Sequence, residues 1–303
     1  MILGSSIDPQ FGPVLLFGLG GQLVEVFKDR ALGLPPLTTT RARRMMERTK
    51  IYTALKGVRG RKAVDLAALE GLLVRFAQLI TEQRWIKELD INPLMASPEQ
   101  LIALDARVVL YDKDTTKEQL PKLAIRPYPI KYVGTWTAKD NTKVTIRPIL
   151  PEDETLLAKF HTVLSDKTVF MRYLQPIMLQ DRVMHERLAR ICHVDYDREI
   201  ALVAESTDSA GERNVMGVVR MSKIHGKSDE ARMSILIGDP YQGIGLGGEL
   251  IRRAVEVARS ENIARMNAIL TADNQVMIHI FKKLGFEIVP LAEENLVAAV
   301  IQL

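Results

Sequence analysis

Apolar positions in the first third of the chain alternate between strand-like and helix-like spacing. Val14–Phe17 is an unbroken apolar run that stops at Gly18, which predicts a buried strand, and Leu23–Phe27 alternates as a second strand. Two further strands are expected at 86–91 and 101–110. One set of apolar residues recurs at every third or fourth position and predicts an amphipathic helix: Leu66, Leu69, Leu73, Phe76 and Ile80.

The stretch 112–141 lacks this periodicity. It is rich in Lys, Asp and Thr and contains Pro121, Pro127 and Pro129, a composition typical of a linker or an extended connector. We therefore expect three parts: a domain at 1–111, a linker at 112–141 and a second domain at 142–303.

The second domain is expected to begin with a strand at 144–146 and a helix opened by Pro151, because proline followed by acidic residues favours a helix start. A second helix is expected at 179–191, with Met184, Leu188 and Ile191 facing inward. The remaining pattern predicts these elements: strands at 200–204, 215–221 and 231–237, a helix over 250–258, a strand at 265–270, a helix with Val276, Ile280 and Leu284 inward, and strands at 286–290 and 296–302. This β-α-α-β-β-β-α-β-α-β-β order predicts an α/β fold with helices layered on a mixed sheet.

Composition narrows the class of protein. The 303 residues carry a net charge of +4, and no apolar run approaches the roughly 20 residues that a membrane-spanning helix needs. The single cysteine, Cys192, excludes an intrachain disulfide framework and cannot alone build a thiolate zinc site. We expect a cytoplasmic protein with no membrane partner.

One basic cluster interrupts the even distribution of charge. Such a patch attracts phosphate-rich ligands or nucleic acid, but no aromatic ladder accompanies it, so a solvated helix face is the favoured interpretation and no nucleic-acid partner is expected. The cluster consists of Arg41, Arg43, Arg44, Arg48, Lys50, Arg59, Arg61 and Lys62.

A glycine-rich segment follows the strand predicted at 231–237. Glycines permit positive φ and close approach of a ligand, and the first amides of the following helix are unpaired at the positive end of its dipole. Together these features predict a pyrophosphate cradle. Two alternatives are a connection without a ligand and a dinucleotide fingerprint on Gly243, Gly245 and Gly248; the second is disfavoured because three consecutive strands precede this turn.

The motifs in this half resemble those of the GNAT acyl-CoA-dependent N-acetyltransferases. Gln242–Gly247 reads QGIGLG, which fits the Q/R-x-x-G-x-G/A signature, and Asn274 followed by FKKLGF at 281–286 is similar to the family's C-terminal motif. The HVDYDRE segment at 193–199 resembles that of protein lysine acetyltransferases in which an acyl-CoA synthetase-like half precedes the GNAT domain. The resemblance implies transfer from acetyl-CoA to lysines of protein substrates. It also implies these cofactor-binding residues: Leu236, Ile237, Gln242, Gly243, Ile244, Gly245, Leu246, Gly247, Gly248 and Asn274.

The first domain resembles part of the ATP-grasp domain of ADP-forming acyl-CoA synthetases. The resemblance rests on DPQFGP at 8–13, Gly20-Gly21 with Val24-Glu25, and ELDINPL at 88–94. In that family, Mg²⁺ ligands would correspond to Asn92 and Asp105, which are oxygen donors of the kind that Mg²⁺ prefers. We assign no metal site, and we expect 1–111 to be a structural or regulatory remnant without ligase activity.

The sequence departs from the lysine acetyltransferases at the catalytic base. Arg232 stands where those proteins carry a glutamate, and a guanidinium cannot accept a proton. Glu230 lies on the same face of the strand, one pleat away, and is the candidate base, acting through a water; alternatively it forms a structural ion pair with Arg232. Phe281 stands where many relatives place a tyrosine that protonates the thiolate.

Three acidic or basic residues and the cysteine are further candidates. His193, Asp195 and Asp197 are candidates for amine positioning or proton transfer, although ordering of the turn before the next strand is favoured for each. Cys192 as an acyl-carrying nucleophile is disfavoured, because a lone cysteine is more often packing. The departure at 232 leaves a catalytically impaired acetyl-CoA-binding sensor as the main alternative, and a small-molecule amine acetyltransferase as a third, which would need a closed acceptor pocket.

Overall fold

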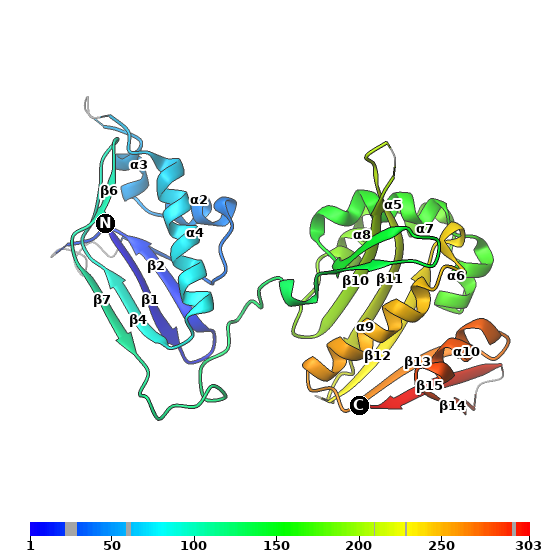
Figure 1. Cartoon of the computed structure of the whole chain (residues 1–303). Coiled ribbons are helices and arrows are strands. Elements are labelled where there is room, and N and C mark those ends of the chain that lie inside the picture. The colour runs from blue at the N-terminus through cyan, green and yellow to red at the C-terminus, as the bar shows by residue number, and fades with distance from the viewer. Residues whose placement is uncertain (22–28, 59–61, 209, 228, 293–294) are drawn as a thin grey trace. The chain divides into compact units, whose positions relative to one another are not determined.

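The chain folds into two compact units, Met1–Pro127 and Tyr128–Leu303 (Figure 1). The computed structural model describes residues 1–21, 29–58, 62–208, 210–227, 229–292 and 295–303. The strand predicted at Leu23–Phe27 lies outside these residues, as do Val24, Glu25, Arg59 and Arg61. The segment predicted as a linker, 112–141, is divided between the units, because part of it forms a strand of the second one.

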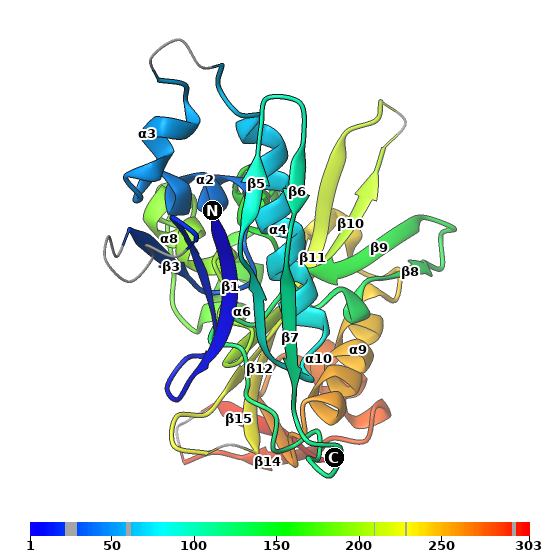
Figure 2. The same cartoon turned by 90° about the vertical axis from the view of Figure 1, so that its left-hand side faces the viewer.

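The first unit has an antiparallel sheet covered on one face by helices. The strand order is β3-β2-β1-β4-β7, and a separate two-stranded ribbon, β5–β6, continues from β4 and β7 (Figure 2). The strands are β1 (Ile2–Asp8), β2 (Gly12–Gly18), β3 (Arg30–Gly33), β4 (Ile86–Ile91), β5 (Leu94–Ala96), β6 (Leu101–Ala103) and β7 (Ala106–Leu110); the helices are α2 (Thr39–Glu47), α3 (Ile51–Leu55) and α4 (Leu66–Glu82).

The predicted helix over 66–80 is α4, and it supplies most of this unit's helical core. Asp65 caps it by accepting a hydrogen bond from the Ala68 amide at 2.9 Å, which satisfies one of the free amides of the first turn. Leu69, Leu73 and Phe76 are buried against Leu3 and Phe17 of the sheet. The single strand predicted at 101–110 is wrong, because the chain breaks between β6 and β7, and β1 was not predicted.

The second unit contains an eight-stranded mixed sheet in the order β14-β15-β13-β12-β11-β10-β9-β8. Every neighbouring pair is antiparallel except β12 and β13, which run parallel. Its strands are β8 (Gly134–Thr137), β9 (Lys143–Pro148), β10 (Glu199–Thr207), β11 (Arg213–Lys223), β12 (Glu230–Ile237), β13 (Arg265–Thr271), β14 (Glu287–Pro290) and β15 (Leu296–Gln302). Its α-helices are α5 (Glu154–Thr162), α6 (Asp166–Tyr173), α7 (Leu179–Arg182), α8 (His185–Cys192), α9 (Leu246–Ser260) and α10 (Gln275–Lys283), with short 3-10 turns η1 (Ile130–Tyr132), η2 (Pro151–Asp153) and η3 (Asp239–Tyr241).

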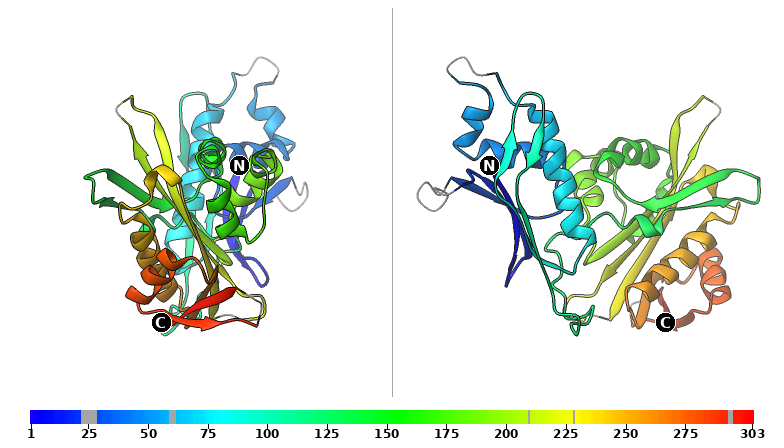
Figure 3. Two further views of the ribbon diagram at one scale, coloured as in Figure 1. Left: turned by 90° about the vertical axis from the view of Figure 1, so that its right-hand side faces the viewer. Right: turned by 60° about the vertical axis from the view of Figure 1, so that its left-hand side comes forward.

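Helices cover both faces of this sheet. Along β10, Ile200 and Leu202 pack in the core that contains α9 and α10, whereas Ala201 and Val203 pack in the core that contains α5 and α8. This alternation is what a strand buried on both sides requires. In the right-hand view of Figure 3, the yellow strands separate the green helices from the orange helix α9. The predicted α/β fold class is confirmed.

Two helical predictions need correction. The helix expected over 179–191 is two helices, α7 and α8, and Met184 lies in the break with half of its surface exposed instead of facing inward. In α10, Val276 is 73% exposed, while Ile278 and Phe281 are buried. This helix carries apolar residues on more than one face, so spacing alone could not identify the buried stripe. Helix α6 was not predicted.

Candidate active site

The parallel strands β12 and β13 separate at the centre of the second unit. They pair only from Glu230–Arg232 to Arg265–Asn267. Beyond Arg232, the edge of β12 that faces β13 has no strand partner in the described part of the chain, whereas its other edge stays paired with β11 through Ile237. Peptide groups along this edge are therefore available to an extended ligand.

The glycine-rich turn lies at the end of this opened strand and begins α9. Gly243 and Gly245 have φ of +80° and +93°, the left-handed region that glycine adopts without strain, and Gly245 is the N-cap of α9. The first helical bond runs from the Glu249 amide to the Gly245 carbonyl. Within the described residues, no amide from 243 to 248 donates a hydrogen bond, as expected for the open end of a helix. These free N–H groups at a positive dipole end suit a phosphate.

Lys139 lies beside the same turn and was not predicted. Its amide donates to the Ile244 carbonyl at 3.2 Å, and its side-chain carbons lie 3.5–3.8 Å from where a Cβ on Gly245 would stand. Lys139 belongs to the β8–β9 connection, in the stretch predicted as a linker. The β8–β9 hairpin also contacts α9 through the hydrogen bond from Arg253 to the Thr135 carbonyl, so the tertiary fold brings this lysine to the turn and no local sequence signal identifies it.

Other predicted cofactor residues already have partners within the protein. The Gln242 side-chain amide lies 3.4 Å from both the Thr168 hydroxyl and the Ile237 carbonyl. Asn274 caps α10 by accepting from the Met277 amide at 3.3 Å. Phe281 is buried and packs edge-to-face on Phe286, so its ring serves the core.

The face of β12 that looks toward α5–α8 carries Glu230, Arg232, Ser234 and Leu236, because alternate side chains share a face. Ser234 and Leu236 line a pocket of about 660 Å³. Neither Glu230 nor Arg232 lines it. Ile237 points to the opposite core.

Glu230 is engaged with cations other than Arg232. Its carboxylate accepts from Lys227 Nζ at 2.6 Å and lies 3.9 Å from Arg265 Nη1. The hydrogen bond from Lys227 lowers the pKa of Glu230, and the charges of Lys227 and Arg265 add to this effect. These contacts are those of a structural ion pair, and a lowered pKa makes a carboxylate a weaker base.

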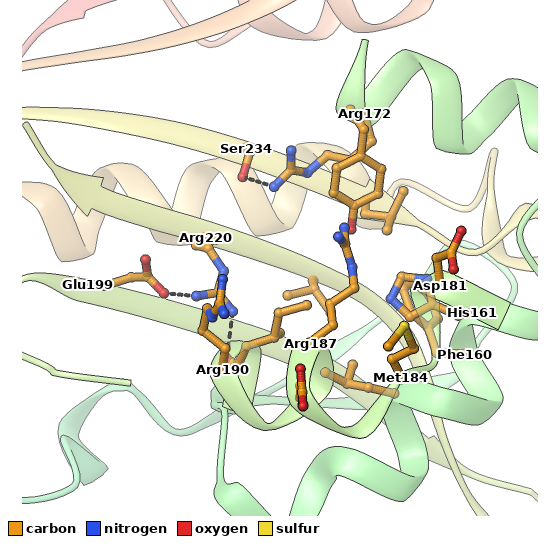
Figure 4. A pocket seen from close by; sticks show the side chains of 16 residues that line it. Phe160, His161, Arg172, Asp181, Met184, Arg187, Arg190, Glu199, Arg220 and Ser234 are labelled. Carbon is orange, nitrogen blue, oxygen red and sulfur yellow. Dashed lines mark hydrogen bonds and ion pairs between the residues drawn. The ribbon is translucent and has the colours of Figure 1, made fainter. Parts of the chain in front are cut away.

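The pocket is lined by arginines from several elements (Figure 4). Arg172 donates to Ser234 Oγ at 2.7 Å, and Arg220 donates to the Ile191 carbonyl at 2.7 Å and pairs with Glu199. The complete lining is Leu157, Phe160, His161, Arg172, Tyr173, Asp181, Met184, Glu186, Arg187, Arg190, Ile191, Glu199, Val218, Arg220, Ser234 and Leu236. No signal in the sequence joined these residues, because they are spread over the helices from α5 to α8 and the strands from β10 to β12.

The remaining candidates from the sequence lie outside this lining. Burial raises the pKa of Cys192 to about 11, so the buried thiol stays protonated near neutral pH, as expected of a packing residue. Asp195 accepts from the Asp197 amide at 3.1 Å and lies 3.5 Å from Arg198, which orders the turn before β10. His193 is the exposed C-cap of α8.

In the first unit, Asn92 and Asp105 are neighbours through the backbone. The Asn92 amide donates to the Asp105 carbonyl at 3.2 Å, and Asn92 Oδ1 accepts from the Gly21 amide at 3.0 Å. Within the described ranges, no group of three or more His, Cys, Asp or Glu side chains is arranged to hold a metal ion. In the basic cluster, Arg43 is bound by Glu70 at 2.7 Å and 3.0 Å.

None of the described helices is both long and apolar enough to cross a membrane.

Comparison with known proteins agrees with these two architectures. Residues 1–110 match the ATP-grasp domain, and residues 143–287 match the acetyltransferase (GNAT) domain. The second unit therefore has the GNAT fold, which defines a class of acetyltransferases. It follows an ATP-grasp-like domain that is related to CoA ligases. The GNAT match supports acyl-CoA-dependent acetyl transfer with acetyl-CoA as the acyl donor.

Three relatives define the similarity further. The beta subunit of ADP-forming acetate–CoA ligase I from Pyrococcus furiosus is 44% identical over 110 residues, which are 36% of this chain and 47% of the relative. An acetyltransferase from Pseudomonas aeruginosa is 29% identical over 147 residues, 48% of this chain and 76% of the relative. The crystal structure of the GNAT domain of S. lividans PAT superposes with a TM-score of 0.53 at 25% identity, covering 58% of this chain and all of that one.

The chain spans less than half of the length of the CoA ligases that match its first domain.

Proposed function

We propose that this protein is an acetyl-CoA-dependent N-acetyltransferase whose active site lies between β12 and the pocket at α5–α8. One observation carries the proposal: among the described residues, the amides of 243–248 have no hydrogen-bond acceptor, and they follow a strand that is unpaired on one edge beyond Arg232. These amides would bind the diphosphate of acetyl-CoA, with Lys139 adding a positive charge. The pantetheine arm would then follow the open edge of β12 toward Leu236 and Ile237.

The proposed reaction is direct transfer to an amine. An acceptor ammonium loses one proton, the nitrogen attacks the thioester carbon, the C–N bond forms and the C–S bond breaks. A second proton passes from nitrogen to the departing thiolate, so the products are an amide, the coenzyme A thiol and one released proton. A backbone amide near Leu236–Ile237 would stabilise the oxyanion. Phe281 cannot donate a proton, but a thiolate leaves readily because thiols are far more acidic than alcohols.

Two features support a second candidate function. Arg232 stands at the position of the family glutamate, and Glu230 is bound to Lys227 and Arg265. Both favour a sensor that binds acetyl-CoA without transferring the acetyl group. Glu230 as the base remains a prediction from its place on the same strand face as Arg232, and protein lysine as the acceptor remains a prediction from the resemblance to lysine acetyltransferases.

The test combines binding and transfer. Calorimetry with acetyl-CoA, and transfer from [¹⁴C]acetyl-CoA to lysate proteins and to free amines, are measured for the wild type, Arg232→Glu and Glu230→Gln. Transfer by the wild type supports the enzyme. Binding with transfer only in Arg232→Glu supports the sensor, and a chain that neither binds nor transfers contradicts both.

A further inference from the structure

The pocket beside β12 holds more positive charge than its carboxylates neutralise. Four arginines line it: Arg172, Arg187, Arg190 and Arg220. Arg220 pairs with Glu199, but Arg172 donates only to the neutral Ser234 hydroxyl and Arg187 has no ion-pair partner among the described residues. The other two lining carboxylates, Asp181 and Glu186, are exposed.

Arg172 and Arg187 come from different helices and contact the same aromatic ring. Their guanidinium carbons lie 4.8 Å and 5.0 Å from the centre of the Tyr173 ring, which orients both groups from α6 and α8 (Figure 4). Burial lowers the pKa of Arg172, and the nearby Arg187 adds to this effect. Both guanidinium groups therefore lie beside the same ring, and among the described residues neither forms an ion pair with a carboxylate.

Buried polar atoms around the pocket also lack partners. Arg187 Nε and His161 Nδ1 are buried and form no hydrogen bond within the described residues, and His161 is only 3% exposed. Native proteins rarely leave such atoms unpaired, and each case calls for a ligand, an ion or a water. A group rich in acceptor oxygens would satisfy the guanidinium groups.

We propose that this pocket binds an acceptor amine that carries a carboxylate, with Arg172 and Arg187 binding the carboxylate. This inference rests on the proposed function and names its acceptor. Guanidinium groups bind carboxylates through paired, charge-assisted hydrogen bonds, whereas they repel an ammonium. The volume of about 660 Å³ lies within the range of pockets for small molecules. Ser234, bonded to Arg172, is two residues from Leu236 on the open strand, so a carboxylate there places its amine near the thioester.

The same carboxylate chemistry has a second source, a dicarboxylic acyl chain such as that of succinyl-CoA. The experiment therefore varies acceptor and donor separately on the full chain. Acceptors are matched pairs that differ only in the carboxylate, phenylalanine against phenylethylamine and tyrosine against tyramine, each with acetyl-CoA. Succinyl-CoA with phenylethylamine tests the donor.

Arg172→Gln and Arg187→Gln remove the charge and keep most of the side-chain volume. Arg198→Gln is the control, because Arg198 is exposed and lies outside the pocket. We expect each pocket variant to lose at least about tenfold more kcat/KM for the amino acid than for its matched amine, with Kd for acetyl-CoA unchanged. Equal losses for both members of a pair, or preference of the wild type for the amines that lack a carboxylate, would overturn the proposal. Loss confined to succinyl-CoA would assign the arginines to the donor and also overturn it.

A readout without turnover separates this inference from the proposed function. Calorimetry measures binding of N-acetylphenylalanine and N-acetylphenylethylamine to the chain saturated with coenzyme A. Tighter binding of the carboxylate compound, lost in Arg172→Gln but not in Arg198→Gln, supports the carboxylate site even if transfer fails. Equal binding of both compounds contradicts it. Circular dichroism and thermal melts test whether the variants fold. Arg187→Lys keeps the positive charge but loses the planar guanidinium that binds a carboxylate through two hydrogen bonds, so it is expected to recover part of the affinity.

Discussion

Replacement of Gly243 by alanine, compared with a control glycine of similar φ, separates the effect of ligand contact from the effect of backbone strain. Gly243 has φ of +80°, and no atom of the described residues lies within 4 Å of the position that a Cβ would occupy. The methyl group of Gly243→Ala therefore meets solvent in the free protein. In the complex it would project into the space that the diphosphate needs.

A matched control exists in the loop between β11 and β12. Gly226 has φ of +78° and is equally free of described neighbours within 4 Å. Left-handed backbone costs an L-residue about 1–2 kcal/mol, and the reduced entropy of the unfolded chain returns about 0.4–1 kcal/mol. Both variants should lose about 1 kcal/mol of unfolding free energy, or about 2–4 °C in Tm for a domain of this size.

Binding of acetyl-CoA should differ between the two variants. Loss of one charge-assisted hydrogen bond costs about 1.5–3 kcal/mol, and about 1.4 kcal/mol corresponds to a factor of ten. Calorimetry should therefore show that Kd rises about 10- to 100-fold in Gly243→Ala and stays within about twofold of the wild type in Gly226→Ala. Equal affinities in the two variants would refute the proposal that the turn at 243–248 binds the diphosphate of acetyl-CoA. The proposed position of acetyl-CoA along β12 would then also be wrong.

Three further predictions concern charged groups. Glu230→Gln should lower kcat less than about threefold, because Lys227 already binds this carboxylate; a loss of a hundredfold in the transfer assay would restore Glu230 as the base. Arg232→Gln should raise the pH at which kcat/KM reaches its plateau by about one unit, since a nearby cation lowers the pKa of an acceptor ammonium and its removal reverses that shift; an unchanged pH profile would separate Arg232 from the amine. Asp153→Ala should destabilise the second unit by about 3 kcal/mol in urea unfolding, because Asp153 binds the buried Arg147 at 2.6 Å and 2.8 Å; a change below about 0.5 kcal/mol would show that Glu205, which Arg147 also contacts at 2.7 Å, is a sufficient partner for this buried charge.

The periodicity of apolar residues predicts the elements whose side chains follow one regular pattern of burial. The strands at 200–204, 215–221 and 231–237 are confirmed because alternate side chains face two different cores, and the helix over 66–80 is confirmed because one stripe of it is buried. Residues 134–137 show no strand pattern in the sequence, because a four-residue edge strand buries too little to impose one. The sequence predicts Met184 inside a helix, because apolar spacing continues across a break in the chain.

The two halves of the candidate site differ in how far the sequence could predict them. The residues of the glycine turn are contiguous in the chain, so their spacing by itself indicates a cradle. The arginine pocket joins Arg172, Arg187 and Ser234 from α6, α8 and β12, and only the fold brings them together. Lys139 reaches the turn for the same reason, because the β8–β9 hairpin contacts α9 and its first turn.

Catalysis without a glutamate at position 232 requires another way to remove the proton from the acceptor amine, and the pocket would supply it. A glutamate base removes a proton that a free ammonium would hold near neutral pH. Guanidinium groups close to the acceptor make that ammonium less stable, and each unit by which its pKa falls increases the reactive free amine tenfold. A carboxylate on the acceptor keeps the ligand in the pocket although its amine is repelled. Arg172 and Arg187 would thus bind the substrate through one group and activate it at another, and the identity of the acceptor decides whether this chain is an enzyme or a sensor.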